Sequence, residues 1–288
     1  MYNIPEKEVM HGFSKSLASA TSWFQKNFRN IGKAMAVLSI FIAIVVSATV
    51  GGNIGSVKLD NISYIPFHEI SLQNVIVYVA GIFLVAIAIL FWYGKAFSVL
   101  GGSFKVTKND VAFAGLRFLQ GGMLSFFVFG ILGVVIAVAA VKMAVWLWVL
   151  FVLYLLFVSV PLYIVEYDYM LTDHSYRESL RRGFKAIREQ WGRVFFRVLF
   201  VNAVAILLMA VAMLPGVALM LSIYDNATAM LMDGATPTPL IIFVFEYLFI
   251  AVGSVAALGV KFWSLVALKE FLNECRVYSI QLKADKEE

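Results

Sequence analysis

Six stretches of the sequence are apolar over about the length that a membrane-spanning helix needs. About 20 residues are required, because a helix rises about 1.5 Å per residue and the hydrocarbon layer is about 30 Å thick. The stretches are Ala34–Val50, Val75–Tyr93, Met123–Val141, Met143–Val165, Val198–Ser222 and Leu240–Val260. Little more than Lys142 separates the third from the fourth, and we expect two spans there because one helix over both would be about 65 Å long. The sequence therefore predicts an all-α polytopic membrane protein with six transmembrane helices.

Composition excludes the other broad classes of protein. The 288 residues are 61% hydrophobic and 14% charged, whereas soluble domains average about 45–50% and about 25%. A water-soluble globule needs more polar surface, and a disordered chain needs fewer apolar residues. The single cysteine, Cys275, excludes a disulfide scaffold. The net charge of +5 is explained by the membrane, so nucleic acid is not an expected partner.

The basic residues predict the orientation of the chain. In a six-span arrangement, 21 of the 23 lysines and arginines fall on one side, and Lys58 and Lys142 remain for the other. Loops rich in lysine and arginine stay in the cytoplasm. We therefore expect a multi-pass protein of the cell (inner or plasma) membrane with both termini in the cytoplasm.

Amphipathic segments precede three of the spans. Apolar residues recur at helical spacing from Val9 to Ile31, and a shorter segment follows Asn109, a candidate helix cap. The third segment begins at Ser175 and Glu178, which fit a capping box. Its aromatic and aliphatic face lies opposite a basic face, formed by Arg177, Arg181, Arg182, Lys185 and Arg188. Such helices suit the headgroup plane, where cations bind anionic lipid. The chain then reads as three copies of an interfacial helix followed by a transmembrane hairpin, or as three unrelated amphipathic helices.

One region resembles a known family. The residues are Pro161-Leu-Tyr-Ile-Val-Glu166, Glu178-Ser-Leu-Arg-Arg-Gly-Phe184 and Trp191-Gly-Arg193. They are similar to the membrane domain fused to some glycerophosphodiester phosphodiesterases, and to its stand-alone bacterial relatives. Ser179-Leu180 departs from the pattern, which more often has a small residue before the basic pair. The resemblance implies a membrane fold without an established activity, and this sequence contains no phosphodiesterase catalytic domain.

Glu246 is the acidic residue that lies well inside a predicted span, about seven residues or roughly 10 Å from its outer end. A carboxylate in hydrocarbon is costly, so we expect it to face the bundle interior or water. A pair with Lys142, or a protonated carboxyl between helices, is favoured over a proton- or cation-linked site. Gly253 lies near the same helical face and would allow a neighbouring helix to approach closely.

Three other polar or helix-breaking positions lie within the spans. Asn202 is about one turn inside the fifth span, and we expect it to join helices rather than bind a substrate. Pro161 and Pro215 interrupt the fourth and fifth spans. They are interpreted as kinks, although such breaks also line transporter sites.

Acidic residues and a histidine gather after the fourth span: Glu166, Asp168, Asp173 and His174. Carboxylates and imidazole can bind a divalent metal. Their spacing matches no familiar metal motif, and nearby arginines favour an ion-pair network. No catalytic motif is recognised. We therefore expect no metal, no cofactor and no enzymatic activity.

We expect a single membrane domain over residues 1–288. It comprises an interfacial helix at 1–33, spans one to four at 34–165, a cytoplasmic basic amphipathic helix at 166–197, spans five and six at 198–260 and a cytoplasmic tail at 261–288. The favoured function is a non-enzymatic scaffold or accessory subunit that binds lipid headgroups, another membrane protein or a second copy. The alternatives are a small transporter or channel that uses Glu246, and a membrane-embedded enzyme acting on lipid through the acidic group near His174.

Overall fold

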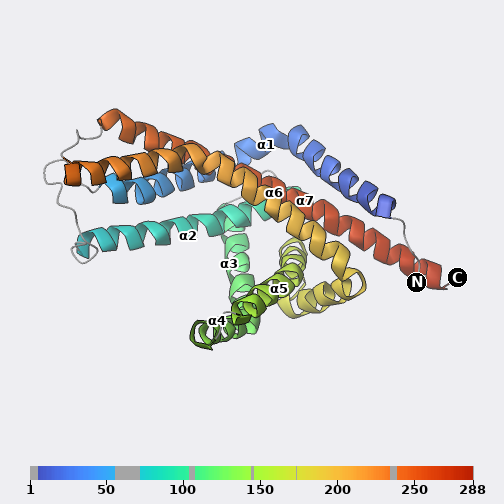
Figure 1. Ribbon diagram of the computed structural model, residues 1–288. Coiled ribbons are helices and arrows are strands. Elements are labelled where there is room, and N and C mark those ends of the chain that lie inside the picture. Colours follow the sequence, from blue (N-terminus) through green and yellow to red (C-terminus); the bar gives the residue numbers. More distant parts are fainter. Residues whose placement is uncertain are drawn as a thin grey trace. The chain divides into compact units, whose positions relative to one another are not determined.

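The computed structural model describes residues 6–55, 72–103, 108–143, 146–172, 174–233 and 239–287, and not every side chain within them. In these ranges every regular element is a helix (Figure 1). In chain order they are α1 (Glu6–Gly55), α2 (Leu72–Leu100), α3 (Lys108–Ser125), the π-helical turn η1 (Phe126–Gly130), α4 (Ile131–Met143), α5 (Trp146–Leu171), α6 (Tyr176–Asp233) and α7 (Leu240–Glu287). The predicted all-α class is confirmed for this part of the chain.

Five helical segments are long and apolar enough to cross a membrane. They are Ser14–Val50, Val79–Leu100, Asn109–Ile136, Val194–Ile223 and Ile241–Phe271. Large apolar side chains on them are exposed, with exposed fractions of 79% for Val37, 68% for Phe196 and 64% for Leu207. Water penalises exposed apolar surface of this extent, whereas hydrocarbon does not. The five segments therefore indicate a multi-pass membrane protein. The predicted span at residues 143–165, largely within α5, is not among them and stays a prediction.

The third and fourth predicted spans form two separate helices. The third continues from α3 through η1 into α4, where the Ile131 N–H donates to the Phe126 carbonyl. The Tyr154 hydroxyl of α5 donates to the Phe129 carbonyl at 2.6 Å. A Cβ placed on Gly133 would lie 3.3 Å from the Tyr154 ring. Helix α5 thus packs directly on η1 and α4, which confirms two helices in place of one long element.

The amphipathic segments are continuous with the helices that follow them. Helix α1 has 50 residues and α6 has 58, so the predicted boundaries at residues 33 and 197 are not helix ends. Asn109, predicted as a cap, lies inside the first turn of α3. A helix of 58 residues is about 87 Å long, almost three times the hydrocarbon thickness. A single crossing perpendicular to the hydrocarbon layer would therefore contain only about a third of α6.

The two prolines predicted to interrupt spans do not end a helix. Pro161 lies inside α5 and Pro215 lies inside α6. Each removes one backbone N–H donor from its helix. Neither position is a broken helix of the kind that lines a transporter site.

Two compact units share the long helices. Unit 1 comprises residues 1–31, 93–203 and 263–288, and unit 2 comprises residues 32–92 and 204–262. The boundaries between the units fall inside α1, α2, α6 and α7.

In unit 1, α2, α5 and α7 meet around buried aromatic side chains. The Tyr167 hydroxyl donates to the Leu265 carbonyl at 2.6 Å, and the Tyr167 ring lies edge-on to Phe97 with centroids 5.3 Å apart. All three residues are buried. Because a buried tyrosine hydroxyl needs a partner, this hydrogen bond stabilises the contact between α5 and α7.

Helix α2 ends in a glycine turn that α7 completes. Gly102 adopts a φ of +95°, and its N–H donates to the Val99 carbonyl at 3.0 Å. The Ser103 N–H donates to the Ser98 carbonyl at 3.1 Å, which gives a Schellman motif. The Lys269 ammonium donates to the Leu100 carbonyl, where its charge complements the helix dipole.

In unit 2, α1 contacts α2 and α6 contacts α7. The indole N–H of Trp92 donates to the Ser39 hydroxyl at 3.1 Å. On the other pair, a Cβ placed on Gly216 would lie 3.0 Å from the Ile250 nitrogen, and one on Gly253 would lie 2.7 Å from the Ala212 carbonyl oxygen. The two contacts run in opposite directions along the helices, so α6 and α7 are antiparallel.

A glycine also sets the distance between α2 and α3 in unit 1, and this generates a prediction. A Cβ on Gly94 would lie 2.5 Å from the Gly115 nitrogen and 2.9 Å from the Val111 carbonyl oxygen. Backbone atoms cannot move aside, so Gly94→Ala should lower the free energy of unfolding by about 1–3 kcal/mol. Denaturant titration followed by circular dichroism in detergent measures this.

Gly122→Ala is the matched control, because no atom lies within 4 Å of its Cβ position. It should leave stability unchanged or raise it by up to about 1 kcal/mol, since alanine favours a helix over glycine. Equal losses for both variants would contradict the close approach of α2 and α3.

Candidate functional site

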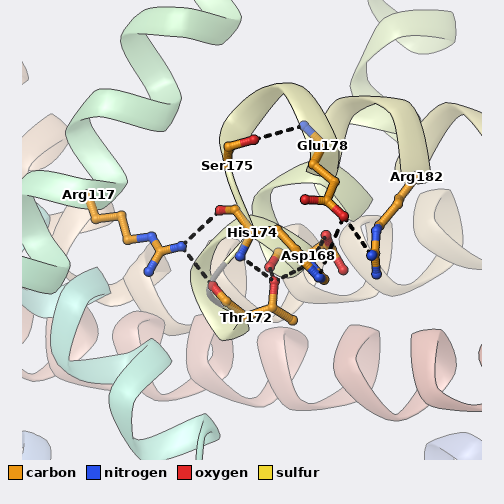
Figure 2. Close-up of polar contacts among 7 residues, drawn as sticks. All are labelled: Arg117, Asp168, Thr172, His174, Ser175, Glu178 and Arg182. Carbon is orange, nitrogen blue, oxygen red and sulfur yellow. Dashed lines mark hydrogen bonds and ion pairs between the residues drawn. The ribbon is translucent and has the colours of Figure 1, made fainter.

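The densest set of polar contacts lies where α5 ends and α6 begins (Figure 2). His174 Nδ1 lies 3.1 Å from Asp168 Oδ2 and 2.7 Å from the Thr172 hydroxyl. The Thr172 hydroxyl donates to the Asp168 carbonyl, so it can only accept from the imidazole. His174 therefore carries a proton on Nδ1, shared between Thr172 and the Asp168 carboxylate. We call Asp168, Thr172 and His174, together with Glu178 and Arg182, the junction cluster.

The start of α6 supplies the second half of the junction cluster. The Ser175 hydroxyl accepts the Glu178 N–H at 3.3 Å, which is one of the two hydrogen bonds of the predicted capping box. The Glu178 carboxylate lies 2.6 Å from Arg182 Nη2 and 3.9 Å from His174 Nε2. Asp168, on the other side of the imidazole, is buried. His174 therefore lies between two carboxylates, and a protonated imidazolium would bridge them.

Arg117 of α3 binds the turn between α5 and α6. Its guanidinium donates to the carbonyls of Thr172 at 2.7 Å and His174 at 3.2 Å (Figure 2). The same group lies 4.6 Å from the centre of the Tyr169 ring, within range of a cation–π interaction. These carbonyls follow the end of α5, where helix N–H donors are no longer available. Arg117 thus connects α3 to the turn between α5 and α6.

The junction cluster has the chemistry of an ion-pair network. Among the residues that the structure describes, no three histidine, cysteine or acidic side chains are arranged to hold a metal ion. Of the predicted set, Asp168 and His174 are brought together, Glu166 is half-buried in α5, and Asp173 lies outside the described residues.

The predicted basic face is exposed where the structure describes it. Arg177, Arg181, Arg182 and Lys185 are all exposed, and the Arg188 side chain lies outside the described residues. Arg182 is paired with Glu178. The face therefore presents a row of cations along the N-terminal part of α6, with one acidic side chain among them.

The opposite, aromatic face of this segment packs on its own chain. Phe184 stacks on Phe129 with ring centroids 5.8 Å apart, and Trp191 lies 5.3 Å from Phe157. A Cβ on Gly183 would lie 2.7 Å from the Val165 side chain, so α6 lies close against α5. The described part of the face expected to enter lipid therefore makes contacts between helices, while Phe184 keeps an exposed fraction of 37%.

Asn202 connects two helices. Its Nδ2 donates to the Val198 carbonyl at 2.9 Å within α6, and its Oδ1 accepts from the Tyr163 hydroxyl of α5 at 3.4 Å. This is the arrangement expected of a residue that joins helices. Lys142 lies in α4, but its side chain is outside the described residues, so its pairing with Glu246 stays a prediction.

Glu246 of α7 is fully buried in unit 2, with an exposed fraction of 0%. Neither of its carboxylate oxygens has a hydrogen-bond partner among the described residues. Its neighbours Phe245 and Phe249 are exposed and their rings stack on each other with centroids 6.3 Å apart. The carboxyl therefore faces inward while the aromatic residues face outward.

The sequence alone does not predict the roles of Arg117, Thr172 and Lys269. Arg117 could have been noticed as a cation within an otherwise apolar helix. Its partners lie 55 and 57 residues further along the chain, and no periodic pattern connects positions so far apart. Lys269 and Leu100 are separated by 169 residues, so this contact also depends on tertiary structure.

The contacts of Arg117 lead to a prediction about stability. Arg117→Ala would leave two carbonyls without their charged donor and should lower the free energy of unfolding by about 1.5–3 kcal/mol. Arg181→Ala removes an exposed arginine and should change it by less than about 0.5 kcal/mol. Denaturant titration of both purified variants measures the difference, and similar stabilities would contradict the role of Arg117.

No family model matches the chain, and neither the curated proteins nor the solved structures with which it was compared contain a match.

Proposed function

We propose that this chain is an integral protein of the inner or plasma membrane with six spans. The five apolar segments would be joined by the fourth predicted span, formed by α5, which has 26 residues and packs on α4. An even number of crossings puts both termini on one side, and the basic residues favour the cytoplasm. The similarity of residues 161–193 to the membrane domain of some glycerophosphodiester phosphodiesterases supports a membrane role.

Within that membrane we propose a non-enzymatic scaffold or accessory subunit that binds anionic lipid headgroups. The observation that carries this proposal is the exposed row of Arg177, Arg181, Arg182 and Lys185. The aromatic face behind this row contacts η1 and α5, which sets the side of α6 on which the row lies. Guanidinium groups bind phosphate in two-pronged geometry, so a phospholipid headgroup suits this surface. A membrane-protein partner with an acidic surface, or a second copy, would use the same charges.

A second candidate function is a small transporter or channel that uses Glu246. Its support is the complete burial of this carboxyl inside unit 2. Intramembrane acidic residues commonly mark ion or proton pathways. Uptake of a labelled cation or proton flux in vesicles, lost in Glu246→Gln, would favour this function over the scaffold.

The basic face should determine how tightly the protein retains anionic lipid. Each surface cation contributes about 1 kcal/mol to binding of anionic lipid, so the double variant R181Q/K185Q should bind phosphatidylglycerol roughly thirtyfold more weakly. Titration of phosphatidylglycerol into phosphatidylcholine nanodiscs that contain the protein, followed by mass spectrometry of retained lipid, measures the affinity.

The control K283Q/K286Q removes the same number of charges from the C-terminal tail. It should retain lipid as the unmodified protein does, and R181K/K185R, which keeps both charges, should lose less than the glutamine variant. If the tail variant loses as much lipid as R181Q/K185Q, net charge alone attracts the lipid and the proposed surface is wrong.

Orientation can be measured with fused reporters. Alkaline phosphatase fused after residue 288 should be inactive, because it folds only outside the cytoplasm, whereas fluorescent protein at that position should fluoresce. The same phosphatase fused after residue 60, in the predicted first outer loop, should be active. The reverse pattern would overturn the cytoplasmic assignment of the termini.

A further inference from the structure

Glu246 lies on the face of α7 that contacts α6. Four and seven residues further along the helix are Ile250 and Gly253, the two positions in close contact with α6 in unit 2. Spacings of four and seven residues place side chains on one helical face. Glu246, Ile250 and Gly253 are all buried. The carboxyl therefore lies about one helical turn beyond the contact between Ile250 and Gly216.

The close approach of the two helices excludes water from the carboxyl. Gly216 and Gly253 bring the backbones together, because a Cβ at either position would collide with the other helix at 3.0 Å or less. Glu246 has an exposed fraction of 0%, and neither oxygen has a hydrogen-bond partner among the described residues. Solvent does not reach the group, and no described donor replaces it.

The charged groups of unit 2 do not compensate an ionised Glu246. Apart from Glu246, the charged residues of this unit with described side chains are Lys33, Asp225 and Lys261. Lys261 is fifteen residues, or about 22 Å, away from Glu246 along α7. Lys33 and Lys261 are both within two residues of the boundary with unit 1. Asp225 of α6 is exposed, and the antiparallel register places it roughly 8 Å further out along the axis. It carries the same charge as Glu246 would.

Among the side chains that the structure describes, Tyr247, the adjacent residue on α7, is the remaining titratable group near the carboxyl. It is half-buried and has no charge at neutral pH. Burial of an isolated carboxylate here would cost the whole hydration free energy of its charge. Burial of the neutral acid costs only the free energy of its unmade hydrogen bonds. The neutral acid is therefore the form compatible with this packing.

We propose that Glu246 is a proton-binding site inside the membrane, where the contact between α6 and α7 holds its carboxyl as the neutral acid. The ligand of this site is a proton. Loss of the proton would place an uncompensated charge between two closely packed helices, so its release requires that water reach the carboxyl. The inference goes beyond the lipid-binding role and does not depend on it.

A neutral carboxyl in an apolar environment reacts with a hydrophobic carbodiimide, and this provides the test. The acid proton moves to one carbodiimide nitrogen while the carboxyl oxygen bonds to the central carbon. The acyl group then migrates from that oxygen to a nitrogen and gives a stable N-acylurea. No atom leaves and nothing is oxidised, so the peptide gains the mass of one carbodiimide.

The experiment uses the full chain in phospholipid vesicles, treated with dicyclohexylcarbodiimide and mapped by peptide mass spectrometry. We expect an adduct on Glu246 at neutral pH that declines as the pH rises and the proton is lost. A water-soluble carbodiimide should not modify this residue, although it should modify the exposed Glu178. The adduct should be lost in Glu246→Gln and kept in Asp225→Asn, which removes an exposed carboxylate from the facing helix.

Two results would overturn the proposal. One is the absence of an adduct on Glu246 at neutral and acidic pH. The other is equal modification by both reagents, since this would show a carboxyl in contact with water. Both results are measured on the protein without substitutions, so they remain valid even if Glu246→Gln fails to fold. Neither result affects the lipid titration, because that experiment concerns the basic face of α6.

Discussion

Helices in hydrocarbon gain little from burying apolar side chains, so close backbone contact must hold them together. This constraint governs the arrangement of both units. Gly94 allows α3 to approach α2, Gly183 allows α5 to approach α6, and Gly216 and Gly253 bring α6 against α7. Each functional candidate depends on one of these contacts. The contact at Gly183 brings the first turns of α6 against α5 beside the junction cluster, and the contacts at Gly216 and Gly253 close α6 and α7 beside Glu246.

The packing of the aromatic face changes the meaning of the amphipathic pattern. A helix with aromatic residues on one face and arginines on the other is typical of a segment that lies in the headgroup plane. Here Phe184 and Trp191 contact Phe129 and Phe157 of the same chain, and α6 continues without a break toward the membrane. These contacts cover part of the apolar side, whereas the described arginines and Lys185 on the basic face are exposed. This favours recognition of phosphate over insertion among acyl chains.

Much of the fold follows from the sequence, since the length of apolar stretches and their helical period are local properties. The all-α class, the separate helices around Lys142 and the helix start at Ser175 are all predicted in this way. Helix boundaries are less predictable, because polar residues such as lysine and apolar residues such as leucine both favour a helix, and nothing at residues 33 or 197 ends one. The hydrogen bonds from Arg117 to the turn between α5 and α6 cannot be predicted from the sequence. Its two acceptors are backbone carbonyls, which have no side-chain signature.

The contacts of Asp168 and Lys269 in unit 1 differ from those of Glu246 in unit 2 in one respect that bears on function. In unit 1, Asp168 is buried but faces His174, and Lys269 donates to the Leu100 carbonyl at the end of α2. The hydrogen bonds of these groups offset the free-energy cost of their desolvation, so folding alone accounts for them. Glu246 makes no such contact among the described residues, and a leucine at this position would fold at lower cost. Groups that break the rules of stability are concentrated at functional sites. Packing explains the glycines around Glu246, but a reversible charge on this carboxyl is what explains the acid itself.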